Sequence, residues 1–248
     1  MPDDTAPAAD AQSTAQPESK AVDPFDPESF KEPAIMTAES PDSGVKDASK
    51  VKILVFDMGH VFVDFDWDKV CQGFCDKAGI TREEFRPVLA HVGSLGYELG
   101  HITTDEFLKE LNAKLGTAIT LAEFTNLWNA TFHENQSMAD LLQELGKTRP
   151  LYLLSNTNEN HFEYLEGTYK VTRHFSEHIL SYQVGLSKPD SKIYEEVLKR
   201  SGHDAAECLF VDDLQPNVDA AKALGMHTIR FAGYDDLKAR LTELGIIA

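Results

Sequence analysis

The sequence predicts an α/β protein with a doubly wound parallel sheet, and three observations support this fold class. From Val51 onward, short strand-like runs alternate with helix-like segments, which is typical of a parallel sheet with helices on both faces. The gap of roughly 95 residues between the first two strands is almost entirely helical in pattern. Residues 1–50 hold seven of the eleven prolines and form a separate segment.

That first segment, residues 1–50, is expected to be a disordered tail. It consists largely of Pro, Ala, Ser, Asp and Glu, with two aromatic residues. Such a composition cannot bury enough apolar surface to offset the entropy lost on ordering. Its four larger apolar side chains are a candidate docking motif, although the composition favours a solvated tail: Phe25, Phe30, Ile35 and Met36.

The first predicted strand, 51–57, is an almost uninterrupted apolar run that ends in Asp57. A run of this kind is typical of a buried strand in a parallel sheet. A charged side chain is costly in such a core, so Asp57 is expected to face the crevice outside the carboxyl ends of the strands. The other predicted strands are 150–155, 178–182, 207–212 and 227–231.

The long helical gap contains repeated helix-start signals. Capping boxes, in which a Thr is followed three residues later by a Glu, occur at Thr81, Thr103 and Thr120. A related pattern at Ser137 predicts the start of the helix that returns the chain to the sheet. Apolar residues at helical spacing predict the core of a small helical bundle without a catalytic role: Phe107, Leu111 and Leu115, and Phe124, Leu127, Trp128 and Phe132.

Composition narrows the setting and the partners. With 23 Lys and Arg against 41 Asp and Glu, the net charge is −18, which argues against binding to nucleic acid or to anionic membranes. Cys71, Cys75 and Cys208 are too few for a disulfide framework, and the first two are expected to face a core. No apolar run could span a bilayer and no signal-peptide pattern occurs, so we expect a cytoplasmic protein.

Three polar segments follow Asp57 in a distinctive order: Ser155-Asn156-Thr157, Ser187-Lys188-Pro189-Asp190 and Asp212-Asp213. Together these four motifs resemble the haloacid dehalogenase-like (HAD) superfamily, most of whose members are phosphatases with an Asp nucleophile. The resemblance covers the chain beyond the tail, and 211–226 matches closely.

The resemblance implies a domain organisation. A Rossmann-like core would comprise residues 51–65 and 137–248, and the helical residues 66–136 would form an inserted cap. In the superfamily such a cap covers the active site and selects the substrate. Closure of a lid over small substrates excludes water from the reacting centre.

The acidic residues point to a metal-dependent nucleophilic site. Asp57 is the candidate nucleophile, which would form an aspartyl-phosphate. Asp212 and Asp213 provide the hard oxygen ligands that suit Mg²⁺. The resemblance implies that Asp57 and the backbone carbonyl of Gly59 complete the ligand set. Asn217 is expected to orient the acidic pair.

The remaining motifs are expected to hold the phosphoryl group. Phosphoryl transfer requires positive charge and hydrogen-bond donors around the equatorial oxygens. Lys188 would supply the charge, the Ser155 hydroxyl a hydrogen bond, and the backbone N–H of Asn156 a second one. An anionic substrate needs such local positive charge in a chain this acidic.

One position departs from the superfamily's pattern. Its phosphatases normally carry a second Asp two residues after the nucleophile, where this chain has Gly59. That Asp acts as general acid and base, a role worth roughly 10²- to 10⁴-fold in rate. His60 or Asp64 could take over proton transfer, but the motif assigns neither a role.

The leading hypothesis is a phosphatase whose leaving group needs little protonation, such as the anomeric oxygen of a hexose 1-phosphate. The segments 57–66, 97–102 and 155–158 look like a subgroup that includes bacterial α-glucose-1-phosphate phosphatases. Haloacid dehalogenases also lack the second Asp, but they lack the acidic pair as well, so Asp212 and Asp213 argue against that alternative. A slow or silent binding module is the third hypothesis. The sequence therefore predicts a Mg²⁺-dependent phosphatase that acts on a small phosphorylated metabolite.

Overall fold

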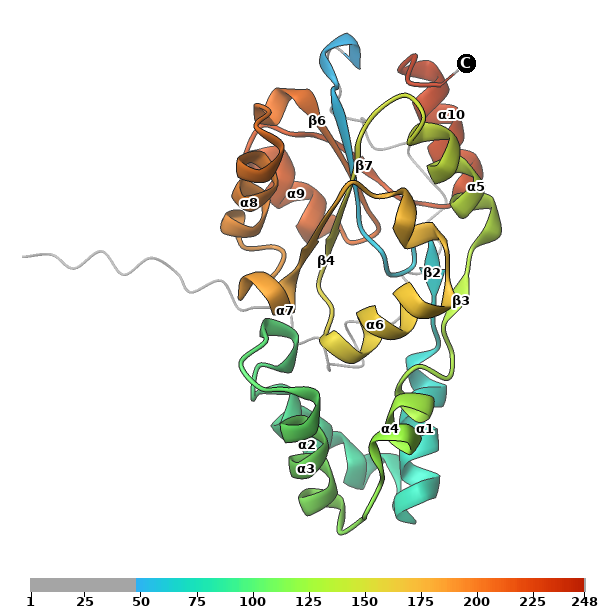
Figure 1. The fold of residues 1–248 in the computed structure, drawn as a ribbon, viewed down its shortest axis with the longest axis vertical. Helices are drawn as coiled ribbons and strands as arrows, with labels where there is room; N and C mark the ends of the chain where they lie inside the picture. The colour runs from blue at the N-terminus through green and yellow to red at the C-terminus, as the bar shows by residue number, and fades with distance from the viewer. Residues whose placement is uncertain (1–47, 248) are drawn as a thin grey trace, which may run out of the picture.

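The computed structural model describes residues 48–247, so nearly all of the predicted tail lies outside the described residues. Five parallel strands form the central sheet in the order β5-β4-β1-β6-β7 (Figure 1). Their bounds are β1 Ile53–Phe56, β4 Leu151–Ser155, β5 Glu177–Leu180, β6 Cys208–Asp212 and β7 His227–Arg230. All five lie where strands were predicted, which confirms the doubly wound α/β class.

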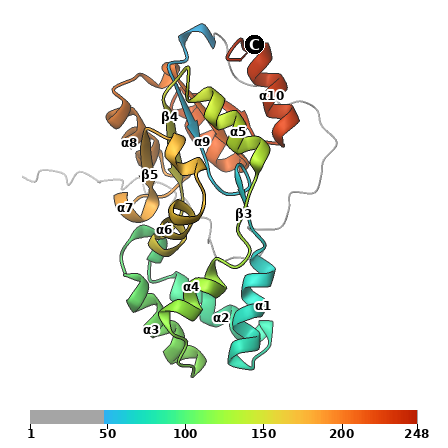
Figure 2. The same ribbon diagram turned by 45° about the vertical axis from the view of Figure 1, so that its right-hand side comes forward.

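Side chains along each strand alternate between two cores, one on each face of the sheet. Leu54 and Phe56 of β1 face a cluster that also contains residues of α5 (Gln136–Leu145), α6 (Glu159–Thr168) and α10 (Tyr234–Glu243). Ile53 and Val55 face a second cluster with α8 (Ser191–Ser201) and α9 (Gln215–Ala223). Figure 2 shows these helices on the two sides of the sheet. A strand buried on both faces explains why its sequence is a continuous apolar run.

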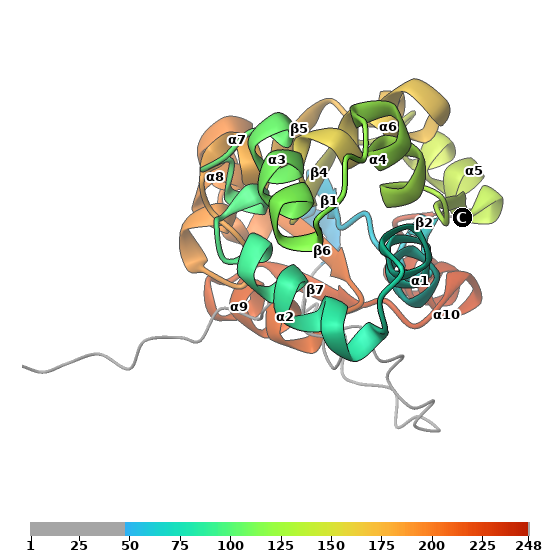
Figure 3. The ribbon, with the colours of Figure 1, turned by 90° about the horizontal axis from the view of Figure 1, so that it is seen from below.

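Four helices and a short 3₁₀ turn lie beyond the carboxyl ends of the strands (Figures 1 and 3). They are α1 (Trp67–Ala78), α2 (Arg82–Gly93), η2 (Tyr97–Leu99), α3 (Thr104–Leu115) and α4 (Leu121–Trp128). The three predicted capping boxes are confirmed, since each Thr caps its helix and each Glu bonds back to the cap residue. These helices bury a core of their own, which includes Phe74, Phe107, Phe124 and Trp128.

The chain enters and leaves this helical unit through two adjacent linkers. Strands β2 (Val63–Asp64) and β3 (His133–Glu134) pair antiparallel. Two residues from the strand ends, the Thr131 hydroxyl accepts a hydrogen bond from the Asp66 N–H at 3.0 Å and donates one to the Asp66 carbonyl at 3.2 Å. The two linkers are therefore tied together at the base of the unit.

Three local predictions were wrong, each because a tertiary contact prevailed. The return helix α5 is capped by Asn135 rather than Ser137, and the Asn135 N–H is held by the Phe62 carbonyl. The third predicted strand stops at Leu180, because Ser181 begins the short helix α7 (Ser181–Val184). Phe132 packs into the sheet's cluster instead of the core of the helical unit.

Other sequence expectations agree with the structure. Cys75 is buried and Cys71 packs against the same helical core, and neither forms a disulfide. Among the described helices, none has the length and apolar character needed to cross a membrane.

Candidate active site

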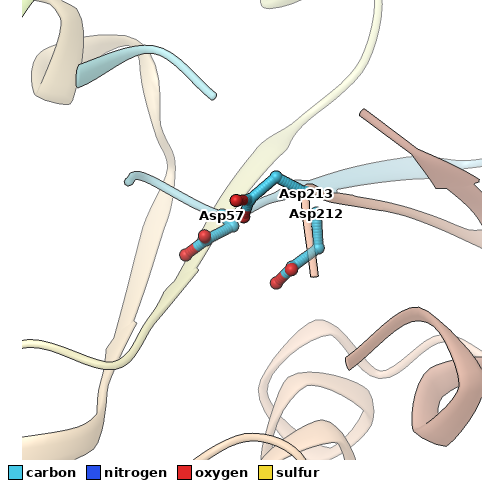
Figure 4. A group of neighbouring side chains, drawn as sticks. All are labelled: Asp57, Asp212 and Asp213. Atoms are coloured by element: carbon cyan, nitrogen blue, oxygen red, sulfur yellow. The ribbon is translucent and has the colours of Figure 1, made fainter. Parts of the chain in front are cut away.

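The predicted site residues converge at the carboxyl edge of the sheet. Asp57 follows β1, Ser155 ends β4 and Asp212 ends β6, and these three strands are neighbours. Parallel strands place such positions at one edge, as the crevice rule requires. The carboxylates of Asp57, Asp212 and Asp213 gather there (Figure 4).

Lys188 bridges two of these carboxylates. Its Nζ lies 2.6 Å from Asp57 Oδ1 and 2.7 Å from Asp212 Oδ2, and its side chain is 2% exposed. Burial would lower the pKa of Lys188, but the Asp212 and Asp57 carboxylates outweigh burial and raise the pKa above its ordinary value. Lys188 therefore stays a cation within the buried cluster.

Asp57 carries an unusual protonation equilibrium. Burial raises the pKa of its carboxyl group from 3.8 to about 7, and the neighbouring Asp212 and Asp213 add to this against the opposing charge of Lys188. Burial and Asp212 likewise raise the pKa of Asp213 to about 6. Three carboxylates beside one ammonium group leave excess negative charge, which favours a bound cation.

The acidic cluster fits a divalent metal ion. Among residues 48–247, Asp57, Asp212 and Asp213 form a group whose ligand oxygens all lie within 4.8 Å of one another. Carboxylate oxygens at this spacing match the small octahedral shell of Mg²⁺, which usually keeps several waters. The donor set and its net charge therefore suit the predicted cofactor.

Asp212 is held more firmly than its neighbour. The Asn217 side chain donates to both Asp212 oxygens, at 3.0 and 3.1 Å, and the Leu214 N–H donates at 2.8 Å. Asn217 thus contacts Asp212, one member of the acidic pair, from the first turn of α9. Because the oxygens of Asp212 already accept several hydrogen bonds, Asp57 and Asp213 are the stronger candidates for direct metal ligands.

The predicted phosphate-binding residues lie beside this cluster. The buried Ser155 hydroxyl is 3.5 Å from the Asn156 carbonyl. The carboxamide of Asn156 bonds to the backbone of Lys188, at 2.8 Å to its N–H and 2.9 Å to its carbonyl. Sequence reasoning brought these residues to one site but did not predict the link between Asn156 and Lys188.

Gly59 and its neighbours form a separate contact group. A Cβ at Gly59 would lie 3.3 Å from the ring of Phe65. The His60 ring packs against the same Phe65 in a tilted arrangement, with centroids 4.4 Å apart, and its Nδ1 lies 3.9 Å from Asp64 Oδ1. His60 also has a positive φ of 53°. The His60 side chain therefore contacts Phe65 and Asp64, and its backbone N–H donates to the Val63 carbonyl.

Arg230 is a charged group that sequence reasoning missed. It ends β7, beside β6, and its Nε donates to the Asp213 carbonyl at 3.2 Å. Its charge lowers the pKa of the Asp213 carboxyl, against burial and the larger effect of Asp212. A cation at the carboxyl end of a predicted strand was visible in the sequence, and the rule that selected Asp57 would have selected Arg230.

Comparison with known proteins establishes the family. The family model for haloacid dehalogenase-like hydrolases matches residues 51–225. A D-ribitol-5-phosphate phosphatase of Bacteroides thetaiotaomicron is 33% identical over 203 residues, which are 78% of this chain and 98% of the relative. The chain therefore belongs to the haloacid dehalogenase-like hydrolase family, as the motifs predicted.

Two further relatives carry information on enzyme class. A HAD family enzyme of Bacteroides thetaiotaomicron, crystallised with magnesium and inorganic phosphate, is 29% identical with a TM-score of 0.68, covering 75% of this chain and 96% of that one. A sesquiterpene phosphatase of Aspergillus oryzae is 28% identical over 177 residues, 71% of this chain and 87% of the relative. These relatives agree with the predicted class, a phosphoric monoester hydrolase.

Proposed function

We propose that this protein is a Mg²⁺-dependent phosphatase that hydrolyses a small phosphorylated sugar or sugar alcohol through a covalent aspartyl-phosphate on Asp57. The observation that carries the proposal is the buried cluster in which Lys188 bridges Asp57 and Asp212, with Asp213 alongside. A nucleophile, a cation and metal ligands in one crevice are the parts that phosphoryl transfer needs.

The chemistry proceeds in two displacements. A carboxylate oxygen of Asp57 attacks phosphorus, the bond to the substrate's oxygen breaks, and the leaving oxygen takes up a proton. Water then attacks the phosphorus of the acyl phosphate, which releases inorganic phosphate and restores Asp57. Lys188, already within hydrogen-bond distance of Asp57 Oδ1, compensates the charge of the transferred group in both steps.

Asp57, Asp213 and the Gly59 carbonyl would hold Mg²⁺, with Asp212 beside them. When bound, the ion neutralises charge on the phosphoryl oxygens and favours the ionised form of Asp57. The Ser155 hydroxyl and the Asn156 backbone N–H would donate to the other phosphoryl oxygens. Each of these roles is proposed because the residue lies at or just after the carboxyl end of one of the neighbouring strands.

The substrate class draws on two arguments. Without an acid at Gly59, an anomeric leaving oxygen favours hexose 1-phosphates, since it departs with less protonation. The name of the Bacteroides relative instead indicates a phosphate on a sugar alcohol. Both are phosphate esters of small polyhydroxy compounds, which is the class we propose, and the position of the phosphate is what the experiment decides.

The test is phosphate release from α-D-glucose 1-phosphate, D-glucose 6-phosphate and D-ribitol 5-phosphate, with Mg²⁺ and with EDTA. We expect Mg²⁺-dependent release that Asp57→Asn abolishes. Preference for glucose 1-phosphate would support the leaving-group argument. Preference for glucose 6-phosphate or ribitol 5-phosphate would refute that argument but would still agree with a phosphatase. A folded protein that binds Mg²⁺ and inorganic phosphate but releases nothing from any ester would overturn the proposal in favour of a binding module.

A further inference from the structure

Two loops carry the residues proposed to hold the phosphoryl group. One follows β4 and contains Ser155 and Asn156, and the other follows α7 and contains Lys188. They are 32 positions apart in sequence. In the structure two side chains tie these segments together, Asn156 in the first loop and Ser181 at the start of α7, and each bonds to both the N–H and the carbonyl of one residue in the other segment.

The first of these links is made by Asn156. Its Oδ1 accepts from the Lys188 N–H at 2.8 Å, and its Nδ2 donates to the Lys188 carbonyl at 2.9 Å. A planar carboxamide that satisfies both backbone groups of one residue fixes the position and the orientation of that peptide. The backbone of Lys188 is thereby held on both sides of its α-carbon.

The second link runs in the opposite direction. The Ser181 hydroxyl, at the start of α7, accepts from the Thr157 N–H and donates to the Thr157 carbonyl, both at 2.9 Å. Ser181 is fully buried, so this bond pair is shielded from water. Because Thr157 follows Asn156 directly, the Ser181 link anchors the loop from which Asn156 reaches Lys188.

We propose that the Asn156 carboxamide is a positioning residue that sets where the Lys188 ammonium group meets the transferring phosphoryl group. The inference rests on the proposed function and adds a role for a side chain beyond the backbone N–H already assigned to Asn156. Lys188 must bridge Asp57 and Asp212 and then also face a phosphoryl oxygen, so its backbone has to stay in place while the charges around it change. A misplacement of about 1 Å in such a group can cost about 10²-fold in rate.

The chain offers a matched control in Asn112, within the helical unit. Its carboxamide also bonds to both backbone groups of one residue, since Nδ2 donates to the Ile119 carbonyl at 2.9 Å and Oδ1 accepts from the Ile119 N–H at 2.8 Å. Asn112→Ala removes an equivalent pair of backbone hydrogen bonds, together with one from the Thr117 hydroxyl at 2.7 Å, so its cost in stability should be at least as large, and it lies in the helical unit rather than at the acidic cluster. Both variants keep every backbone N–H, including that of Asn156.

The experiment measures kcat and KM on the best substrate of the panel, inorganic phosphate affinity in Mg²⁺ by calorimetry, and Tm. We expect Asn156→Ala to lower kcat/KM by about 10²-fold and to weaken phosphate binding about tenfold. Asn112→Ala should change both less than twofold. Equal effects of the two variants on kcat/KM and phosphate affinity would overturn the proposal, because the bonds would then serve only stability. If the alanine variant folds poorly, Asn156→Asp replaces it. That variant keeps an oxygen that accepts from the Lys188 N–H and loses the N–H that donates to the Lys188 carbonyl.

A double-mutant cycle separates positioning from direct contact with phosphate. In a Lys188→Met background, Asn156→Ala should alter inorganic phosphate affinity less than twofold, because the group that Asn156 positions is gone. A loss that persists there would show that Asn156 itself contacts phosphate and would overturn the positioning role. Failure of the proposed function has a different signature, namely a wild-type protein that binds phosphate and Mg²⁺ but hydrolyses no ester.

Discussion

Replacing Asp57 with Asn should remove turnover and stabilise the metal-free protein. The folded state raises the pKa of Asp57 from 3.8 to about 7, so folding favours the protonated carboxyl. The wild-type free energy of unfolding should therefore fall as pH rises from 3.8 towards 7 and stay low above that range. A pKa difference of that size corresponds to on the order of 4 kcal/mol, and a neutral Asn, which resembles the protonated acid in shape, avoids this cost.

The assay is urea unfolding followed by circular dichroism in EDTA, at several pH values between 4.5 and 8.5. The difference in the free energy of unfolding between Asp57→Asn and the wild type should grow with pH by a few kcal/mol, while carboxyl groups outside the acidic cluster cancel in the subtraction. Saturating Mg²⁺ should narrow the difference, because an ion at 100 times its Kd stabilises the wild type by about 2.7 kcal/mol. A difference that is independent of pH, or an Asn variant less stable at pH 8, would refute the argument that burial of this carboxylate is costly.

Three other variants test the proposed metal site, the contact between the helical unit and α7, and the missing acid. Asp213→Asn should weaken Mg²⁺ binding at least about tenfold in calorimetry, since it removes one of three clustered carboxylates; unchanged affinity would exclude Asp213 as a ligand. Gly100→Ala should raise KM, because a Cβ there would clash with the Tyr182 carbonyl oxygen and so move η2 away from α7. An unchanged KM would show that the close contact between η2 and α7 is not needed for substrate binding. Gly59→Asp combined with Phe65→Leu should raise kcat on glucose 6-phosphate by up to about 10²-fold, and no gain would mean that proton transfer is not limiting.

The central sheet was predictable because its signals are local. A continuous apolar run such as 51–57 identifies a strand buried on both faces, and the structure places Ile53–Phe56 between two cores. The chemistry at the strand ends was predictable for a related reason. Parallel strands align their carboxyl ends, so an Asp after one strand and an acidic pair after another must meet at the same edge.

The features that the sequence did not predict depend on contacts between residues that are far apart in the chain. Ser181 lies within the predicted strand 178–182, but its hydroxyl bonds to the backbone of Thr157 and it begins a helix. Both Asn135 and Ser137 are good helix caps, and the choice between them follows from the bond of the Asn135 N–H to the Phe62 carbonyl. The link between Asn156 and Lys188 belongs to the same category, since neither residue type signals the other.

The structure also changes how the glycine at position 59 is understood. In the sequence this glycine stands where a carboxylate is expected. In the fold its α-carbon faces the ring of Phe65, and a Cβ added there would lie 3.3 Å from the nearest ring carbon. Phe65 packs edge-on against Phe132, and these two residues lie on the paired linkers that enter and leave the helical unit. An Asp at position 59 would therefore press on the Phe65 ring, which lies between the loop after β1 and those linkers. An acid at position 59 thus requires Phe65 to shift, which is why the rescue variant changes Phe65 together with Gly59.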